Sequence, residues 1–142
     1  MQFEAIASKG QVVPLLFSQH SVAASQTDVK LNILETSNTT LLQVQKISMP
    51  FAGSIVGISV DLSAAASAGQ LTVGAALNGT EKASTTQTIT TQTGKVAVFD
   101  RDAIKFVAGD YIGAEITTNA GWNGTSSDLA VHVYVLFEVS GI

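Results

Sequence analysis

Leu129-Ala-Val-His-Val-Tyr-Val-Leu-Phe-Glu-Val139 is the stretch that decides the fold class. Side chains of a β-strand point alternately to its two faces. One face would be entirely apolar, with Leu129, Val131, Val133, Val135, Phe137 and Val139. The other would carry Ala130, His132, Tyr134, Leu136 and Glu138, which is less polar than a solvated face. We therefore predict a long antiparallel strand whose second face is covered by another subunit or chain segment.

Short alternating segments recur upstream of this strand. Val56, Ile58, Val60 and Leu62 share one face of the segment 52–62, and the segment 71–77 repeats the pattern before a tight-turn signal at Asn78-Gly79. The residues 81–93 are mostly Thr, Gln and Ser, and fit a solvent-facing strand or hairpin, with disorder as the alternative. Helical periodicity is scarce. We predict an all-β protein, an antiparallel β-sandwich or jelly roll.

The first eighteen residues differ from the rest. They carry apolar side chains, among them Phe3, Ile6, Leu15, Leu16 and Phe17, but Gly10 and Pro14 interrupt them. One interpretation is an edge strand of the same domain. The other, which we adopt as the prediction, is an extended N-terminal arm over residues 1–18 that adds to a neighbouring molecule, followed by a single jelly-roll domain over residues 19–142.

The amino-acid composition of the chain limits the kinds of binding partner that we expect. Charged residues make up 13% of the chain and the net charge is −4, so no basic surface for nucleic acid is expected. The chain has no cysteine, and no apolar run approaches the roughly 20 residues of a membrane span. The N-terminal residues lack the basic and apolar regions of a secretory signal, so we expect no export.

No catalytic pattern is visible. The two histidines, His20 and His132, lack metal-ligand spacing, and no serine lies in a Gly-x-Ser-x-Gly motif. Asp100, Asp102 and Asp110 form a local carboxylate group, but Arg101 and Lys105 lie among them, so solvated turns are favoured over a calcium loop. We expect no enzymatic activity, no metal and no cofactor.

Trp122 lies in the polar loop between residues 119 and 128. An aromatic side chain in such a loop can stack on a sugar, or it can anchor the loop against the core. Anchoring is the more common role, but Trp122 remains the candidate residue of a ligand-binding loop.

The segment Phe106-Val-Ala-Gly-Asp-Tyr-Ile-Gly-Ala-Glu-Ile116 resembles a pattern of trimeric jelly rolls of the complement C1q and tumour necrosis factor type. Together with Met49–Val60 and the Leu77-Asn-Gly-Thr80 turn, it is similar to the head decoration, or cement, proteins of tailed bacteriophages. This resemblance covers residues 49–139. It implies a homotrimer on the outer capsid surface of the virion, made in the host cytoplasm, with the major capsid protein and neighbouring trimers as partners.

Under this interpretation His132, Tyr134 and Leu136 lie at the trimer interface. Phe3, Ile6, Leu15, Leu16 and Phe17 would contact the capsid or a neighbouring trimer. The alternative function is a receptor- or glycan-binding head domain of a phage tail fibre or tail tip, with Trp122 in the recognition loop. Neither function involves a membrane or a nucleic acid.

Overall fold

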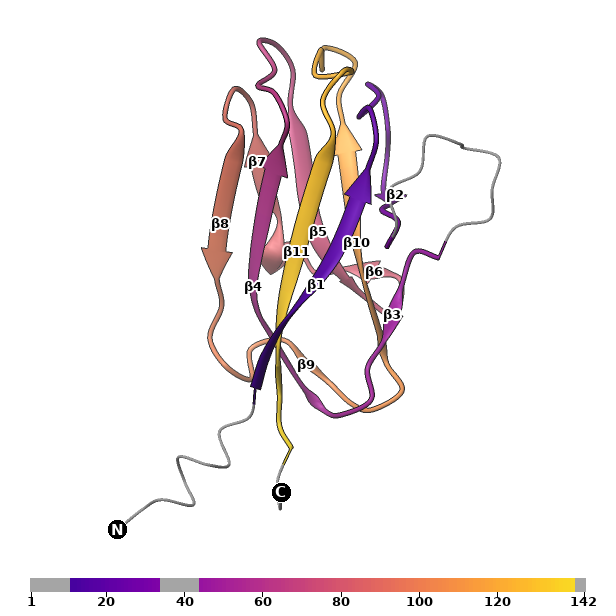
Figure 1. Ribbon diagram of the computed structural model, residues 1–142, viewed down its shortest axis with the longest axis vertical. Helices are drawn as coiled ribbons and strands as arrows, with labels where there is room; N and C mark the ends of the chain where they lie inside the picture. The colour runs from indigo at the N-terminus through magenta and orange to yellow at the C-terminus, as the bar shows by residue number, and fades with distance from the viewer. Residues whose placement is uncertain (1–10, 34–43, 140–142) are drawn as a thin grey trace.

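The computed structural model describes residues 11–33 and 44–139, which form two antiparallel sheets packed face to face (Figure 1). The first sheet has the order β1-β11-β4-β8, with β9 also paired with β4. Its strands are β1 (Gln11–Gln19), β4 (Gly53–Leu62), β8 (Gly94–Val98), β9 (Lys105–Phe106) and β11 (Leu129–Phe137). Apart from the short 3-10 helix η1 (Ala83–Thr85), the described residues contain no helix.

The second sheet has the order β2-β10-β5-β6, with β3 also paired with β10 and β7 with β5. Its strands are β2 (Val29–Lys30), β3 (Ile47–Ser48), β5 (Leu71–Leu77), β6 (Thr80–Glu81), β7 (Gln87–Ile89) and β10 (Tyr111–Thr118). The chain passes repeatedly between the two sheets: β1, β4, β8 and β11 belong to the first, and β2, β5, β7 and β10 to the second. This is the topology of a jelly roll, and the predicted fold class is confirmed.

The alternation predicted for the last strand is present in β11. Val131, Val133 and Val135 are fully buried between the sheets, whereas His132, Tyr134 and Leu136 are half-buried on the outer side. Strand β11 pairs with β1 on one side and with β4 on the other, and a bulge in β4 shifts the register between Tyr134 and Val135.

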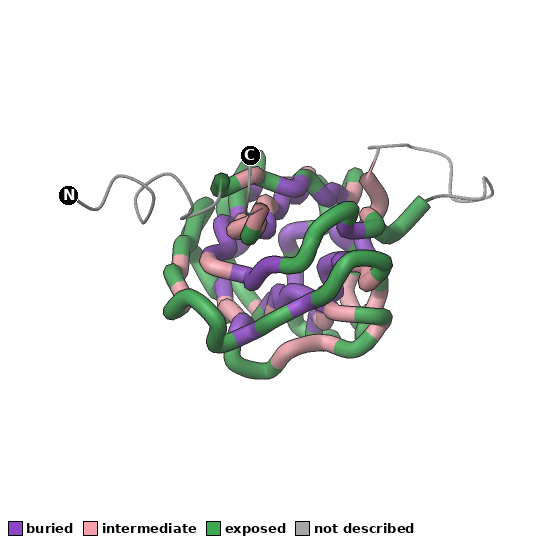
Figure 2. Tube along the Cα trace, turned by 90° about the horizontal axis from the view of Figure 1, so that it is seen from below, coloured by how far each residue is buried: buried purple, intermediate pink, exposed green. Residues whose placement is uncertain are grey.

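The hydrophobic core fills the space between the sheets, and Figure 2 shows buried positions along the trace on both sides of that space. Strand β4 contributes Ile55, Ile58 and Val60, and β10 contributes Ile112 and Ile116. Aliphatic and β-branched side chains of this kind pack well on pleated surfaces, because their shapes interlock across the two sheets.

The Asn78-Gly79 turn signal is also confirmed. Both residues have positive φ, 53° for Asn78 and 83° for Gly79, as a two-residue hairpin turn between β5 and β6 requires. The Thr-rich stretch that follows is not one long strand. It divides into β6, η1 and β7, because Thr85 and Ile89 are fully buried and bring the backbone back toward the core.

The structure corrects the prediction that the arm extends to residue 18. Residues 11–19 form β1, which pairs along its whole length with β11 of the same chain. Leu15 and Phe17 are 8% and 0% exposed within the core of their own domain, so they are not available to a neighbouring molecule. Phe3 and Ile6 lie outside the described residues.

The signal for this strand was present in the sequence. Val13, Leu15 and Phe17 have the period of two that one face of a strand requires, and the structure turns all three inward. Pro14 does not prevent pairing because β1 is an edge strand, where a missing N–H can fall on the side without a partner strand. The edge-strand interpretation is therefore the one that holds for residues 11–18.

We predict that a chain starting at Gln19 will unfold or melt far below a chain starting at Gln11, because the two differ only by most of β1. Removing a buried leucine or phenylalanine side chain costs about 2–5 kcal/mol. Losing Leu15, Phe17 and the strand pairing together would remove much of the roughly 5–15 kcal/mol that stabilises a typical domain.

Circular dichroism melts of the two truncated chains would check this prediction. If the chain starting at Gln19 melted like the chain starting at Gln11, β1 would not be part of the folded domain.

Candidate functional site

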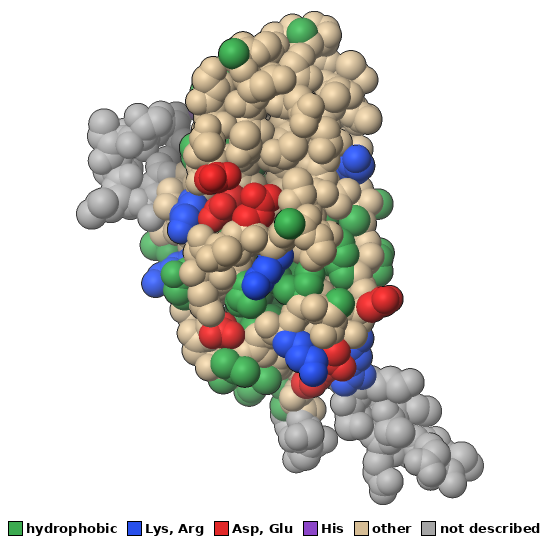
Figure 3. Space-filling view, turned by 180° about the vertical axis from the view of Figure 1, so that it is seen from behind, with side chains coloured by type: hydrophobic (Ala, Val, Ile, Leu, Met, Phe, Trp, Pro, Cys, Tyr) green, Lys and Arg blue, Asp and Glu red, His purple; other side chains and the backbone are tan. Residues whose placement is uncertain are grey.

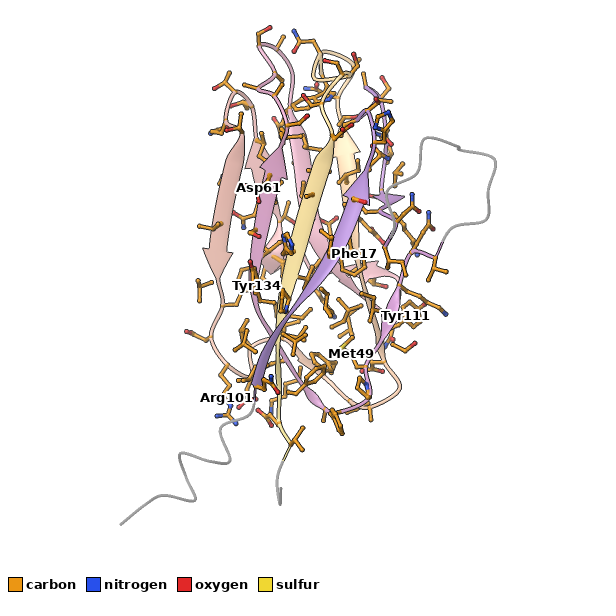
Figure 4. The ribbon with its side chains drawn as sticks, in the orientation of Figure 1. Phe17, Met49, Asp61, Arg101, Tyr111 and Tyr134 are labelled. Carbon is orange, nitrogen blue, oxygen red and sulfur yellow. The ribbon has the colours of Figure 1, made fainter. Side chains whose placement is uncertain are left out.

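The outer side of the first sheet carries the residues predicted for the subunit contact. His132, Tyr134 and Leu136 project there from β11, and the neighbouring strands surround them with small or apolar residues. Tyr134 lies in register between Pro14 of β1 and Gly57 of β4. In Figure 4, Tyr134 lies midway along this sheet. Asp61 lies toward one end of the sheet, and Arg101 lies near the other end.

Edge strands of the same sheet extend this surface with exposed aliphatic side chains. Val12 and Leu16 of β1 are 54% and 46% exposed, and Val96 and Val98 of β8 are 74% and 86% exposed. In register, Val98 lies across from Gly57, and Val96 across from Ser59. We call this surface the valine-rich face; it consists of Val12, Pro14, Leu16, Ser59, Val96, Val98, His132, Tyr134 and Leu136.

The valine-rich face is almost free of charge. Asp61 of β4 lies at one end and Lys105 of β9 at the other, and the outward positions of the described strands between them are uncharged. Two internal contacts order its centre: the Ser59 and Tyr134 hydroxyls are 3.4 Å apart, and the His132 and Tyr134 rings lie 6.2 Å apart. Single exposed valines are ordinary, but a continuous apolar face on a rigid sheet is typical of an interface.

Trp122 does not form a ligand-binding surface in this structure. Its side chain is 2% exposed, and its indole N–H donates a hydrogen bond to the Val22 carbonyl at 3.1 Å. Gly69 and Gly124 approach it so closely that a Cβ at either position would overlap Trp122 atoms. With the ring enclosed, no face is left for a sugar to stack on, and Trp122 anchors its loop as the alternative interpretation had it.

The carboxylates at residues 100–110 serve local structure. Asp110 accepts hydrogen bonds from the Val107 backbone N–H at 2.9 Å and from the Asn78 amide at 3.0 Å, and these bonds lower the pKa of its carboxyl. Gly109, with a φ of 92°, completes this turn. No metal-binding group that includes Asp100, Asp102 or Asp110 occurs within residues 11–33 and 44–139.

The two histidines have different neighbours in the structure. His20 Nδ1 is 2.8 Å from a carboxylate oxygen of Asp128, which also accepts a hydrogen bond from the Ser21 backbone N–H. His132 belongs to the valine-rich face and stacks loosely against Tyr134. Each histidine thus has a structural environment of its own.

A second functional candidate lies on the outer side of the second sheet and was not foreseen from the sequence. Asp28, Glu81 and Glu115 place carboxylate oxygens within 4.8 Å of one another. Asp28 precedes β2, Glu81 ends β6 and Glu115 is in the middle of β10. Figure 3 shows a group of acidic side chains on this side of the molecule, with a basic side chain directly beside it.

Glu115 is the unusual member of this group. It is 5% exposed, on the outer side of β10 and between Lys30 and Gly74 in the register of the sheet. Burial raises the pKa of its carboxyl; Lys30 opposes this shift, and the negative charges of Glu81 and Asp28 add to it. Nothing in the sequence marks Glu115, because the three carboxylates become neighbours only when β2, β6 and β10 assemble.

A hollow of about 380 Å³ adjoins Glu115 on the same side of the sheet. Its lining includes Lys30, Gln45, Lys46 and Tyr111, and the Lys46 ammonium lies 4.6 Å from the centre of the Tyr111 ring. Of the three carboxylates, Glu115 is the one whose residue lines this hollow.

Comparison with known proteins assigns no family. No protein-family model and no curated protein matches the chain. Among solved structures, a carbohydrate-binding module, CBM36, in complex with calcium and xylotriose is 21% identical over 65% of this chain and 70% of its own, with a TM-score of 0.35. Turnip yellow mosaic virus is 11% identical over 94% of this chain and 96% of its own, with a TM-score of 0.31. At these TM-scores neither likeness carries an argument about function.

One further observation concerns membranes. The part of the chain that the structure describes contains no helix with the length and apolarity needed to cross a bilayer.

We predict that Glu115→Gln will raise the melting temperature of metal-free protein at neutral pH and will have little effect in acid. Because the pKa of Glu115 is raised above its ordinary value of 4.5, the native state holds this proton more tightly than the unfolded state. The wild-type protein therefore loses stability as pH rises from the unfolded pKa through the folded pKa. Glutamine carries no charge at any pH.

Melting temperatures of both proteins in a chelator, measured from about pH 4 to about pH 8, would check this difference. A wild-type protein that gained stability relative to the variant over this range would contradict a raised pKa for Glu115.

Proposed function

We propose that this protein is a structural virion protein, a homotrimer that binds the exterior of a phage capsid and stabilises it. The observation that carries the proposal is the valine-rich face, which combines exposed aliphatic side chains with the half-buried His132, Tyr134 and Leu136. The resemblance of residues 49–139 to head decoration proteins supports the trimer and the capsid as partners.

The physical case for self-association rests on the cost of leaving this face in water. Transfer of apolar surface out of water contributes roughly 25 cal/mol per Å². Val96 and Val98, the most exposed of its side chains, lie on the edge strand β8, whereas Tyr134 and Leu136 lie on the central strand β11. A partner surface that covers the whole sheet would therefore bury both kinds of residue together.

The long strands of the first sheet make this face suitable for assembly. β1, β4 and β11 are 9, 10 and 9 residues long and are paired along most of their length, so the surface is presented on a rigid frame. Rigid surfaces lose little conformational entropy on association, which leaves more of the burial free energy for binding.

Capsid binding is the second part of the proposal. Of the residues proposed to contact the capsid or a neighbouring trimer, Phe3 and Ile6 remain proposed contacts outside the described residues. Leu16 lies on the valine-rich face, across from His132, and would be covered by the trimer contact instead. Trimers that bridge neighbouring capsid subunits would stabilise the assembled shell by mass action, because they bind the shell and not its separated subunits. The proposal assigns the protein no catalytic role.

We predict that Val98→Lys will fold normally but will be monomeric, whereas Val107→Lys will remain trimeric. Val98 is on the valine-rich face. Val107, which is 61% exposed, lies in the turn between β9 and β10 and is not one of the residues of that face. An unpaired lysine buried at an interface costs several kcal/mol, and the cost recurs at each symmetric contact. Val107→Lys controls for the added charge and the lost valine.

Sedimentation velocity and circular dichroism of the wild-type protein and both variants would measure mass and folding. A monomeric wild-type protein, or a Val98→Lys variant as trimeric as Val107→Lys, would exclude this face as the trimer contact.

Location in the virion separates the proposed function from its alternative. We predict coat-like stoichiometry on purified particles, and co-sedimentation of the recombinant protein with undecorated capsids that Val98→Lys weakens. A few copies confined to the tail would instead support the receptor- or glycan-binding head domain. In that case the recognition surface would have to be one other than buried Trp122.

A further inference from the structure

We propose that Asp28, Glu81 and Glu115 form a binding site for one divalent cation, with Ca²⁺ as its ligand. The site lies on the second sheet, and the valine-rich face on the first, so the inference is independent of the proposed assembly. It rests on the geometry of the three carboxylates, the unpaired state of Glu115 and the way in which the other two side chains are held.

The spacing of the carboxylates fits a single ion. Ca²⁺ binds oxygen ligands at about 2.3–2.6 Å, so two oxygens of one coordination sphere lie at most about 5 Å apart. The oxygens of Asp28, Glu81 and Glu115 are all within 4.8 Å of one another, which allows one ion to contact all three. Three negative charges this close repel one another, and the attraction of each carboxylate to a cation between them offsets that repulsion.

The environment of Glu115 is a second observation that indicates a ligand. Its side chain is 5% exposed, yet within residues 11–33 and 44–139 no hydrogen-bond donor reaches its carboxylate. Its oxygens reach the open hollow beside them, since Ser54 Oγ is the one fully buried side-chain polar atom without a hydrogen-bond partner among the described residues. Charged groups on side chains buried to this extent are generally paired or bound to a metal. The carboxylate lies with those of Asp28 and Glu81, where an ion would supply the missing partner.

Lys30 does not take this role. It is the register partner of Glu115 across β2 and β10, but no ion pair within 4.0 Å joins the two in the described part of the chain. The Lys30 ammonium instead lies by the β5–β6 turn, 3.2 Å from the position that a Cβ on Gly79 would occupy. The hydroxyl of Tyr111 approaches the same position at 3.3 Å.

The other two carboxylates are held in place by hydroxyl groups. Thr86 Oγ1 donates to Glu81 at 2.9 Å, and Thr117 Oγ1 donates to Asp28 at 3.3 Å. Gly74 provides room for Glu81, because a Cβ there would overlap the Glu81 carboxylate. Hydrogen bonds that orient carboxylate ligands are a regular feature of metal sites.

The chemistry of the ligands selects the class of ion. Three carboxylates and no histidine or cysteine favour a hard cation over zinc or copper. Asp28 is exposed, and the hollow beside Glu115 is open, so water can complete the six to eight oxygen ligands that Ca²⁺ takes. An irregular site from three chain segments suits Ca²⁺ better than Mg²⁺, which requires near-ideal octahedral geometry.

Calcium titration of the full chain, first freed of metal with EDTA, tests the site directly. We expect calorimetry to show one Ca²⁺ per chain, and the melting temperature to rise with Ca²⁺ and to fall again with excess EDTA. Glu115→Gln and Glu81→Gln should each weaken binding at least about tenfold, since loss of even an indirect partner of a metal ligand costs that much.

Asp102→Asn is the matched control. Asp102 is an exposed carboxylate outside the group, and its φ of 67° is one that asparagine tolerates, so this variant should bind Ca²⁺ as the wild type does. Circular dichroism in EDTA verifies that each variant is folded. If Glu115→Gln does not fold, the comparison rests on Glu81→Gln alone.

Absence of saturable Ca²⁺ binding by the wild-type protein would overturn the proposal. So would binding that Glu115→Gln and Glu81→Gln leave intact, because the ion would then be held elsewhere. An equal response to Ca²⁺ and Mg²⁺ that persists in these variants would show nonspecific screening of surface charge and would likewise overturn it.

Discussion

The pairing of β11 with both β1 and β4 is the constraint on which the rest of the structure depends. Because β11 is held on both sides, its alternation is fixed: Val131, Val133 and Val135 must face the second sheet, and His132, Tyr134 and Leu136 must face outward. A shift of one residue would exchange the two faces and place a histidine and a tyrosine in the core. The same pairing therefore determines the core and the composition of the valine-rich face.

The sequence predicted those features that depend on local pattern. The period of two in β11 and the tight turn at Asn78-Gly79 follow from neighbouring residues alone, and the structure confirms both. The extent of β1 does not follow from local pattern, because Pro14 disfavours a central strand but is tolerated at an edge, and the edge position is set by the assembled sheet. The neighbourhood of Asp28, Glu81 and Glu115 had no local signal, since it exists only through the pairing of β10 with β2 and β5, and of β5 with β6.

The two sheets differ in what they present to solvent. The first sheet offers aliphatic and aromatic side chains with charges at its ends, whereas the second offers a carboxylate group beside a hollow lined by Lys30, Lys46 and Tyr111. A jelly roll permits this division, because each strand contributes one row of side chains to the shared core and leaves the other row free to vary. The outward rows of β4, β8 and β11 can thus change without altering the outward rows of β5 and β10.

Pro14 has a consequence for how copies of this protein can join. An unprotected edge strand is a template for strand addition, and repeated addition leads to open-ended polymers. A proline in β1 removes one backbone donor from the edge of the first sheet, so a foreign strand cannot form a continuous ladder there. Head-to-tail growth of the first sheet from copy to copy would need both of its edges, β1 and β8, and is therefore interrupted at Pro14.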